Sequence, residues 1–226
     1  MMAQPEQPGY SKPPSTSSQS ELKQEGFEHT KSLMRQALRK QRKSILEATR
    51  LDFDAQITQH FMAHFEIKKG MRIALYSSFG TEVGTKGLDR FLRASGVDVY
   101  YPRIRKAECS LDFVFVNDPS RDLISGHLNI LEPRGVAFDA ALLDMVVLPG
   151  LAFDRSGGRL GQGQGCFDRA LIKYKGLCVG LAYNCQLVDS VPMLEHDRKV
   201  DVVISEQGMT WTNPLDARRP GGTSSE

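Results

Sequence analysis

The sequence predicts an α/β protein with three layers, in which helices cover both faces of a mostly parallel central sheet built from βαβ units. Two observations lead to this fold class. Apolar runs at 145–148 and 178–183 flank a glycine-rich loop and a helix-like segment, an order that is typical of a βαβ unit. An apolar run, a helical pattern and another apolar run also follow one another within 71–101, which indicates a second unit. Since βαβ connections join parallel strands, a mostly parallel sheet follows.

The composition is that of a soluble globular protein. Of 226 residues, 40% are hydrophobic and 25% are charged, which suits one α/β domain with tails. The net charge of +2 gives no general attraction to nucleic acid or membrane. No apolar run approaches the roughly 20 residues that span a bilayer. The four cysteines form no C-x-x-C pair, which favours reduced thiols. We therefore expect a cytoplasmic monomer that binds neither nucleic acid nor membrane.

Three segments divide the chain. Residues 1–28 are rich in Ser, Pro and Gln and poor in apolar residues, so a disordered N-terminal tail is expected. Residues 213–226 carry prolines and glycines and predict a disordered C-terminal tail. The remaining residues, 29–212, would form a single α/β domain.

The first predicted helix runs from Thr30 to about Ala48 and is strongly basic, with no acidic residue before Glu47. Its six cations are Lys31, Arg35, Arg39, Lys40, Arg42 and Lys43. They could form a solvated basic face. Alternatively, Lys31 and Arg35, one turn apart, could point together at an anion. RNA binding is a third interpretation, which the lack of interleaved aromatic residues weakens.

A second helix is predicted from Phe53 to Phe65, because apolar residues recur at every fourth position. This stripe is expected to face the core. His60 and His64 are also four residues apart, but no glutamate follows His60 as in H-E-x-x-H, so no metal site is predicted there.

The following βαβ unit brings an acidic residue near the end of a strand. A strand is predicted at 71–76, and a helix that Thr85 could cap ends at Gly96, before a strand at 97–101. Ligands of such sheets bind beyond the carboxyl ends of the strands. Glu82 and the glycine-rich loop both follow strands, so they could face one crevice. Otherwise Glu82 is a surface acid or a helix-entry acid.

Three further elements are predicted. They are a strand at 111–115, an extended connection at 131–134 and a last strand at 200–204. Asp197, just before the last strand, could be a second metal-binding carboxylate or part of a charged surface turn.

The glycine-rich stretch has the features of a phosphate-binding loop. Five of the 20 glycines lie within 157–165, where they permit positive φ angles and a close approach of the backbone to a ligand. The free N–H groups of the following helix favour an anion, and Arg155, Arg159 and Arg169 add positive charge. Asp168, in the first helical turn, could bind Mg²⁺ beside a phosphate. A flexible turn with a capping aspartate is the alternative.

The stretch matches neither of two common phosphate-binding motifs. It lacks G-x-x-x-x-G-K-[ST], and Cys166 stands where G-x-G-x-x-G would need its last glycine. The residues alone thus predict a phosphate-binding loop of unassigned type. Cys166 itself could be a reactive thiol at a helix N-terminus or a small neutral filler.

The segment 149–171, PGLAFDRSGGRLGQGQGCFDRAL, resembles the signature of the 5-formyltetrahydrofolate cyclo-ligase family, whose members are also called methenyltetrahydrofolate synthetases. The specific part is R-L-G-x-G-x-G-x-[FY]-D. The likeness extends in order from about Lys31 to Ile204. Its weaker parts are the basic first helix and the segments 82–85, 131–133, 186–188 and 196–197.

The resemblance implies an ATP-dependent enzyme with Mg²⁺ as cofactor. Such an enzyme converts 5-formyltetrahydrofolate to 5,10-methenyltetrahydrofolate and releases ADP and phosphate. The formyl oxygen attacks the γ-phosphoryl group, and N10 then closes the ring. Positioning and charge neutralisation do most of the work in phosphoryl transfer.

The resemblance also implies roles for particular residues. ATP would contact Lys31, Arg35, Arg159, Leu160, Gly161, Gln162, Gly163, Gln164, Gly165, Cys166 and Phe167. The folate substrate would contact Ser77, Glu82, Gln162, Gly163, Gln164, Gly165 and Cys166. Asp168 and Asp197 would hold Mg²⁺, and Arg159 and Asp168 would be catalytic.

Three positions depart from the family pattern. Many relatives have tyrosine in place of Cys166, many have an acid in place of Gly84, and some have lysine in place of Gln164. These departures leave an alternative, a catalytically weak or inactive paralogue that binds folate or nucleotide.

Overall fold

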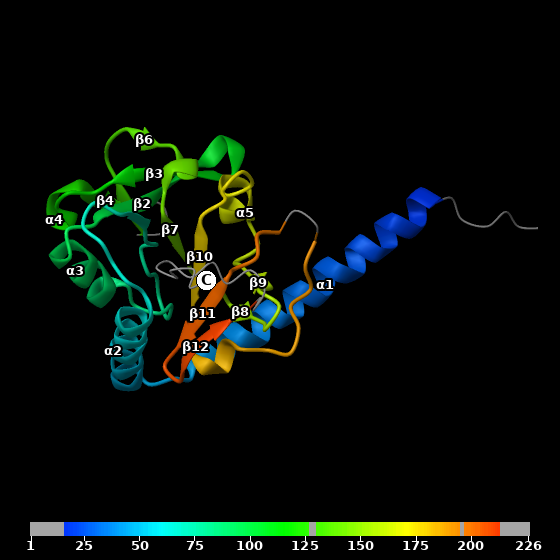
Figure 1. Cartoon of the computed structure of the whole chain (residues 1–226). Coiled ribbons are helices and arrows are strands. Elements are labelled where there is room, and N and C mark those ends of the chain that lie inside the picture. Colours follow the sequence, from blue (N-terminus) through cyan, green and yellow to red (C-terminus); the bar gives the residue numbers. More distant parts are fainter. Residues whose placement is uncertain (1–15, 127–129, 195–196, 213–226) are drawn as a thin grey trace, which may run out of the picture.

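An eight-stranded sheet lies at the centre of the molecule (Figure 1). The structure is a computed structural model and describes residues 16–126, 130–194 and 197–212. In order across the sheet, the strands are β12 (Gly208–Trp211), β11 (Val202–Ser205), β10 (Leu177–Leu181), β7 (Met145–Leu148), β1 (Arg72–Ala74), β2 (Asp98–Arg105), β3 (Ser110–Phe115) and β6 (Ala137–Phe138). The strands from β11 to β2 are parallel, whereas β12, β3 and β6 pair antiparallel at the two edges. The predicted fold class, α/β with a mostly parallel sheet, is confirmed.

Both predicted βαβ units are present. The chain runs from β1 through α3 (Lys86–Ala94) to the parallel neighbour β2, and from β7 through α5 (Cys166–Ala170) to the parallel neighbour β10. α5 has only 5 residues, because the chain leaves the helix at Leu171 and buries Leu171 and Tyr174 against the sheet. Thr85 stands at the N-cap of α3, but its hydroxyl donates to the carbonyl oxygen of Tyr76 (2.9 Å) and does not cap the helix.

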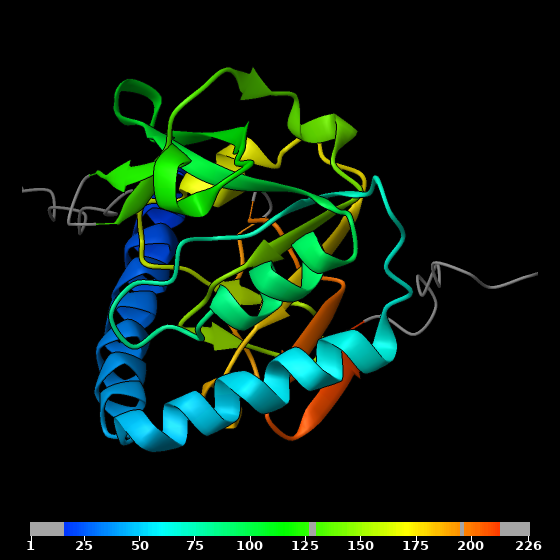
Figure 2. The ribbon, with the colours of Figure 1, turned by 90° about the vertical axis from the view of Figure 1, so that its left-hand side faces the viewer.

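Helices cover both faces of the sheet and complete the three layers. α2 (Glu47–His64) and α3 lie on one face, as Figure 2 shows, and Ile57 and Phe61 of α2 join the apolar side chains of the strands. α5 and the 3₁₀ helix η3 (Ala140–Leu142) pack on the other face, around Phe153 and Tyr174. The predicted apolar stripe of the second helix is confirmed, since Ile57, Phe61 and Phe65 are all buried.

The first helix, α1 (Thr16–Lys43), is longer than predicted, and its N-terminal part extends away from the sheet (Figure 1). The helix begins within 1–28, the predicted N-terminal tail, and includes 16–28. The C-terminal half of α1 is docked, and each residue added to an existing helix gains a hydrogen bond, so the helix can continue through a polar sequence. The other residues of the predicted tails, 1–15 and 213–226, lie outside the described residues, as does His196 of the resemblance.

The boundary between the first two helices also differs from the prediction. α1 ends at Lys43 and α2 begins at Glu47, so Ala48 belongs to the second helix. The hydroxyl of Ser44 donates to the carbonyl oxygen of Gln41 (2.7 Å), a local bond that competes with continuation of the helix.

Shorter elements connect the main ones. Two small hairpins pair β4 (Leu123–Ser125) with β5 (Leu131–Pro133), and β8 (Ala152–Phe153) with β9 (Arg159–Leu160). Among the described residues, the other helical turns are η1 (Lys106–Glu108), α4 (Pro119–Asp122) and η4 (Asn184–Gln186). The edge strand β12 is not predicted from the sequence. Within the described ranges, no helix is long and apolar enough to cross a membrane.

Candidate active site

The glycine-rich stretch begins as a hairpin that a buried aspartate organises. Asp154, between β8 and β9, accepts hydrogen bonds from the backbone N–H groups of Ser156 (2.8 Å), Gly158 (2.9 Å) and Val191 (2.7 Å). Burial alone would raise the pKa of the Asp154 carboxyl, but these bonds and the one from the Ser156 hydroxyl hold the pKa below its ordinary value. The sequence reasoning missed Asp154, although aspartate and serine before glycines are a turn signal.

Glycine is required at position 157. The φ angle of Gly157 is +83°, and a Cβ there would lie 2.4 Å from the carbonyl oxygen of Val200. The N–H of Val200 donates to the carbonyl oxygen of Gly157 (2.9 Å), so the hairpin is joined to the segment that leads into β11. Gly163 (φ 112°) and Gly165 (φ 64°) also have positive φ, as the glycine pattern predicts.

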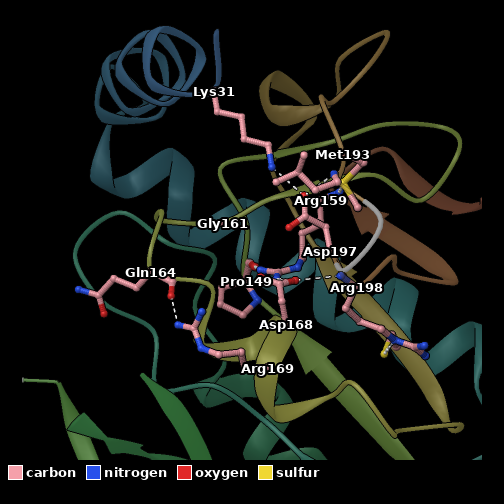
Figure 3. A network of polar contacts seen from close by, with 12 residues as sticks. Lys31, Pro149, Arg159, Gly161, Gln164, Asp168, Arg169, Met193, Asp197 and Arg198 are labelled. Carbon is pink, nitrogen blue, oxygen red and sulfur yellow. Dashed lines mark hydrogen bonds and ion pairs between the residues drawn. The ribbon is translucent and has the colours of Figure 1, made fainter. Parts of the chain in front are cut away.

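One ion pair of the site joins β9 to α5. Nη2 of Arg159 donates to Oδ1 of Asp168 (2.8 Å), and Nη1 donates to the carbonyl oxygen of Pro149 (3.2 Å), as Figure 3 shows. The Arg159 side chain is only 3% exposed and that of Asp168 is 15% exposed. The backbone N–H of Arg198 also donates to Oδ1 of Asp168 (3.0 Å). The two residues predicted to be catalytic are therefore in direct contact.

A second ion pair joins α1 to the segment before β11. Nζ of Lys31 donates to Oδ2 of Asp197 (2.7 Å), and the backbone N–H of Leu194 donates to the same oxygen (2.8 Å). Figure 3 shows Lys31 extending from α1 towards Asp197, beside Arg159. The Lys31 side chain is 7% exposed. The interpretation of the basic residues as a solvated face is therefore wrong for Lys31.

Both ion pairs line one cleft of about 150 Å³. Of the residues predicted to bind nucleotide, those that line the cleft are Lys31, Arg35, Arg159, Leu160, Gly161, Gly163, Gln164 and Gly165. Nε of Arg35 donates to the carbonyl oxygen of Gly161 (3.2 Å) and so joins α1 to the loop. Cationic side chains outnumber carboxylates in the lining, which also includes Arg169, Glu28 and the two paired aspartates. This charge and the glycine backbone suit an anion.

Three residues of the predicted nucleotide site, Gln162, Cys166 and Phe167, do not line this cleft. The Phe167 ring packs under the Arg159 guanidinium, 5.8 Å from its centre. Cys166 is half-buried, and burial raises the pKa of its thiol. This shift favours the interpretation of Cys166 as a neutral filler over that of a reactive thiol.

The loop arginines other than Arg159 make different contacts. Arg169 donates through Nε to the carbonyl oxygen of Cys109 (2.8 Å) and through Nη2 to that of Gln164. Arg169 thereby holds the loop against the connection between β2 and β3. Arg155 is exposed at the hairpin turn and does not line the cleft, so the prediction that it adds charge to the site is wrong.

Gln162 connects the glycine loop to Glu82. Its Oε1 accepts from Nη2 of Arg39 (2.8 Å), and its Nε2 donates to Oε1 of Glu82 (3.3 Å). Glu82 lines a second cavity of about 580 Å³, between α2 and the loop after β1. Glu82 and the glycine loop therefore line two different cavities, and the prediction of one shared crevice is corrected.

The Glu82 carboxylate lies in a partly desolvated setting. Burial raises the pKa of this carboxyl, although the N–H of Phe79 donates to Oε2 (3.1 Å) and Arg42 is nearby. Arg42 is buried, and it donates to the hydroxyl of Thr81 (3.1 Å) and to the carbonyl oxygen of Gly150 (3.3 Å). Arg42 therefore links the loop of Glu82 to the end of β7.

Ser77 precedes Ser78, which lines the second cavity, but bonds to β5. Its hydroxyl donates to the carbonyl oxygen of Leu131 (2.7 Å), which joins the loop after β1 to β5. Neither cavity lining includes Ser77, so its predicted contact with substrate stays a prediction.

Four cations of α1 take part in these contacts. They are Lys31, Arg35, Arg39 and Arg42. The spacing of four, four and three residues places them on one side of the helix. This spacing is a sequence signal from which Arg39 and Arg42 could have been predicted to contact the site. Lys40 and Lys43 are exposed.

The two aspartates are the candidate metal ligands. Asp168 and Asp197 both line the cleft, and each is paired with a cation. Among the described residues, no group of three or more His, Cys, Asp or Glu side chains could hold a metal ion. A hard cation that takes one or two carboxylates, phosphate oxygens and waters, as Mg²⁺ does, fits this donor set.

Comparisons with known proteins agree on one family. The model of the 5-formyltetrahydrofolate cyclo-ligase family matches residues 28–206. The chain is 30% identical over 175 residues to the 5-formyltetrahydrofolate cyclo-ligase of Escherichia coli K12, which covers 74% of this chain and 96% of that protein. It is 28% identical over 186 residues to the mouse protein of the same name, over 76% of this chain and 92% of that protein.

Solved structures show the same similarity. The NMR structure of the 5,10-methenyltetrahydrofolate synthetase of Aquifex aeolicus matches with a TM-score of 0.72 and 28% identity, over 87% of this chain and 96% of that chain. A 5,10-methenyltetrahydrofolate synthetase from Mycoplasma pneumoniae has the same fold, with a TM-score of 0.64 and 22% identity, over 78% of this chain and 98% of that chain.

Proposed function

Because the chain belongs to the 5-formyltetrahydrofolate cyclo-ligase family, we propose that it converts 5-formyltetrahydrofolate to 5,10-methenyltetrahydrofolate with ATP and Mg²⁺, releasing ADP and phosphate. The observation that carries this proposal is the cleft in which Arg159, Asp168, Lys31 and Asp197 meet the glycine loop. This combination provides positive charge, backbone amides and carboxylates in one place, as phosphoryl transfer from ATP requires.

The triphosphate would occupy this cleft. Lys31 and Arg35 approach from α1, and Arg159 approaches from β9. Positive φ angles at Gly163 and Gly165 allow the backbone of the loop to come close to phosphate oxygens. Binding would exchange the two ion pairs, since a phosphate oxygen can replace each carboxylate at Lys31 and Arg159.

The released carboxylates would hold the metal ion. Asp168 and Asp197 would bind Mg²⁺, which neutralises charge on the triphosphate when it is bound. The protein thus supplies two carboxylates, and the nucleotide supplies further oxygen ligands.

The folate would bind where Glu82 meets the glycine loop. An ionised Glu82 can accept hydrogen bonds from the amino-pyrimidinone edge of the pterin. Gln162, which contacts Glu82, would then lie between the two substrates. This arrangement would bring the formyl group towards the γ-phosphoryl group.

The chemistry has two steps. The formyl oxygen forms a bond to the γ-phosphorus, and the bond between that phosphorus and ADP breaks. N10 then attacks the formyl carbon and loses its proton, and phosphate leaves with the formyl oxygen. Arg159 and Lys31 would stabilise the charge on the transferring phosphoryl group.

A direct test measures the product. Purified full-length chain with Mg-ATP and 5-formyltetrahydrofolate should generate the near-ultraviolet chromophore of the methenyl product, together with ADP and phosphate. Folded protein that binds 5-formyltetrahydrofolate or ATP in calorimetry without forming product would support the inactive-paralogue alternative, which the Cys166 departure motivates. Folded protein that neither binds nor reacts would reject both.

A further inference from the structure

A polar network joins the loop that carries Glu82 to α2, and its residues Asp54 and Tyr183 line the same cavity as Glu82. Tyr183, which follows β10, is only 1% exposed. Its hydroxyl donates to Oδ1 of Asp54 on α2 (2.8 Å), and the backbone N–H of Gly84 donates to the same oxygen (2.9 Å). The hydroxyl of Tyr183 also lies 3.5 Å from the carbonyl oxygen of Glu82. The network thus joins α2, the end of β10 and the loop after β1.

The position of the Asp54 carboxylate depends on glycine at 84. A Cβ at Gly84 would lie 2.4 Å from Oδ2 of Asp54 and 3.1 Å from its Cγ. Any side chain at 84 would therefore displace the carboxylate. Because Gly84 has no side chain, Asp54 can accept from its N–H at close range.

Neighbouring contacts hold the loop residue by residue. Thr81 is bound by Arg42, and the carbonyl oxygen of Val83 accepts from the hydroxyl of Tyr76 (2.7 Å). The Thr85 hydroxyl donates back to Tyr76 (2.9 Å). Asp54 and Tyr183 provide the contacts at Glu82 and Gly84 that complete this series. The Glu82 side chain is thereby presented from a backbone that is fixed on both sides.

We propose that Asp54 and Tyr183 are positioning residues for Glu82, holding its loop so that the carboxylate meets the folate substrate. The inference rests on the proposed function. The two residues act through the backbone of Glu82 and Gly84, and neither is required to touch the reacting atoms. A small displacement of a substrate-binding group can reduce catalytic efficiency by up to about 100-fold, so loss of the network should weaken productive binding of the folate.

The inference is tested with Asp54→Ala, Asp54→Asn and Tyr183→Phe in the full-length chain. The alanine and phenylalanine variants should raise the KM for 5-formyltetrahydrofolate about tenfold and leave the KM for ATP within about twofold. Asp54→Asn keeps an oxygen that accepts from Gly84 and Tyr183, so it should restore most of the wild-type KM. Asp52→Ala, at an exposed position of the same helix, is the matched control and should match the wild type.

A double-mutant cycle separates positioning from general stability. If Asp54 acts through Glu82, then Asp54→Ala should add little to the effect of Glu82→Gln in the double variant. Additive effects, or equal changes in the KM values for folate and ATP, would overturn the inference.

Hydrogen exchange of the loop provides a reading that does not depend on catalysis. Exchange of the amides of 82–85 should rise in Asp54→Ala and Tyr183→Phe and not in Asp52→Ala. Unchanged exchange would overturn the inference even in an active enzyme. A wild-type protein with neither turnover nor folate binding would instead reject the proposed function, and with it the folate-positioning role.

Discussion

Asp168→Asn is the most informative single change at the site. The substitution keeps the shape of the side chain and one oxygen that can accept from Arg159 and Arg198, but it removes the negative charge. The variant therefore separates the charge of Asp168 from its hydrogen bonds. In the proposed mechanism that charge both pairs with Arg159 and holds Mg²⁺.

The structure allows the expected loss of stability to be estimated. The Arg159 side chain is only 3% exposed, so its pairing with Asp168 is not a surface ion pair. Breaking a buried pair by removing one partner costs about 3–5 kcal/mol. The retained hydrogen bonds offset about 1 kcal/mol of this cost. We expect a net loss of about 3 kcal/mol, which lowers the Tm of a domain of this size by about 6–12 °C.

The expected loss of activity is larger than a stability effect can explain. A metal ion contributes several kcal/mol to stabilising charge in the transition state. Loss of about 3 kcal/mol of that contribution lowers kcat by about 100-fold. We would measure formation of the methenyl chromophore well below the Tm of the variant, and Tm itself by thermal denaturation. Asp189→Asn, at an exposed position, is the control and should change neither quantity.

Two results would refute this reasoning. Full turnover in a folded Asp168→Asn protein would exclude a metal-binding role for this carboxylate. An unchanged Tm would show that the Arg159–Asp168 pair does not stabilise the domain, so the estimate from burial would be wrong.

Three other predictions concern the rest of the site. Burial raises the pKa of Glu82, and only its ionised form accepts hydrogen bonds from the pterin, so the KM for folate should rise as pH falls through this raised pKa; Glu82→Gln should remove the pH dependence, as profiles of KM against pH would check. Lys31→Met should raise the KM for ATP at least about tenfold, whereas Lys40→Met, on the exposed side of the same helix, should not. Equal KM values for ATP in the two variants would contradict the phosphate-binding role of Lys31. Asp154→Ala should lower the free energy of unfolding by about 3 kcal/mol in urea denaturation. The pKa of Asp154 is lower in the folded protein than in the unfolded chain. The stabilisation by Asp154 is therefore fully present above its unfolded pKa and is lost as pH falls through its folded pKa. If the destabilisation by Asp154→Ala does not become smaller in acid, this account is contradicted.

The central sheet was predictable because its signals are local. The runs at 145–148 and 178–183 are apolar throughout, and the glycines between them mark a loop. The break between α1 and α2 carries no such signal, since Ser44, Ile45 and Leu46 include neither glycine nor proline. β12 was missed because its residues form a strand only by pairing with β11.

In the candidate site, too, local features could be predicted from the sequence and long-range contacts could not. The glycine loop could be found from its own residues, whereas the pair of Lys31 and Asp197 joins positions 166 residues apart. A single sequence contains no sign of that contact, and only the resemblance to a family brought the two residues together. Arg42 was not separated from the other cations of the first helix, because sequence does not distinguish a buried arginine from a solvated one. The contact of Tyr183 with Asp54, 129 residues apart, was missed for the same reason.

Lys31 and Arg42 lie on one helix and contact two different parts of the site. Lys31 faces the cleft of the glycine loop, and Arg42 faces the loop of Glu82. Eleven helical steps separate them, or about 16 Å at 1.5 Å per residue. The number of residues between Lys31 and Arg42 therefore fixes the distance between their contacts. Inserting or deleting a single residue between Lys31 and Arg42 would turn one end by about 100° relative to the other, so this segment cannot change length and still keep both contacts.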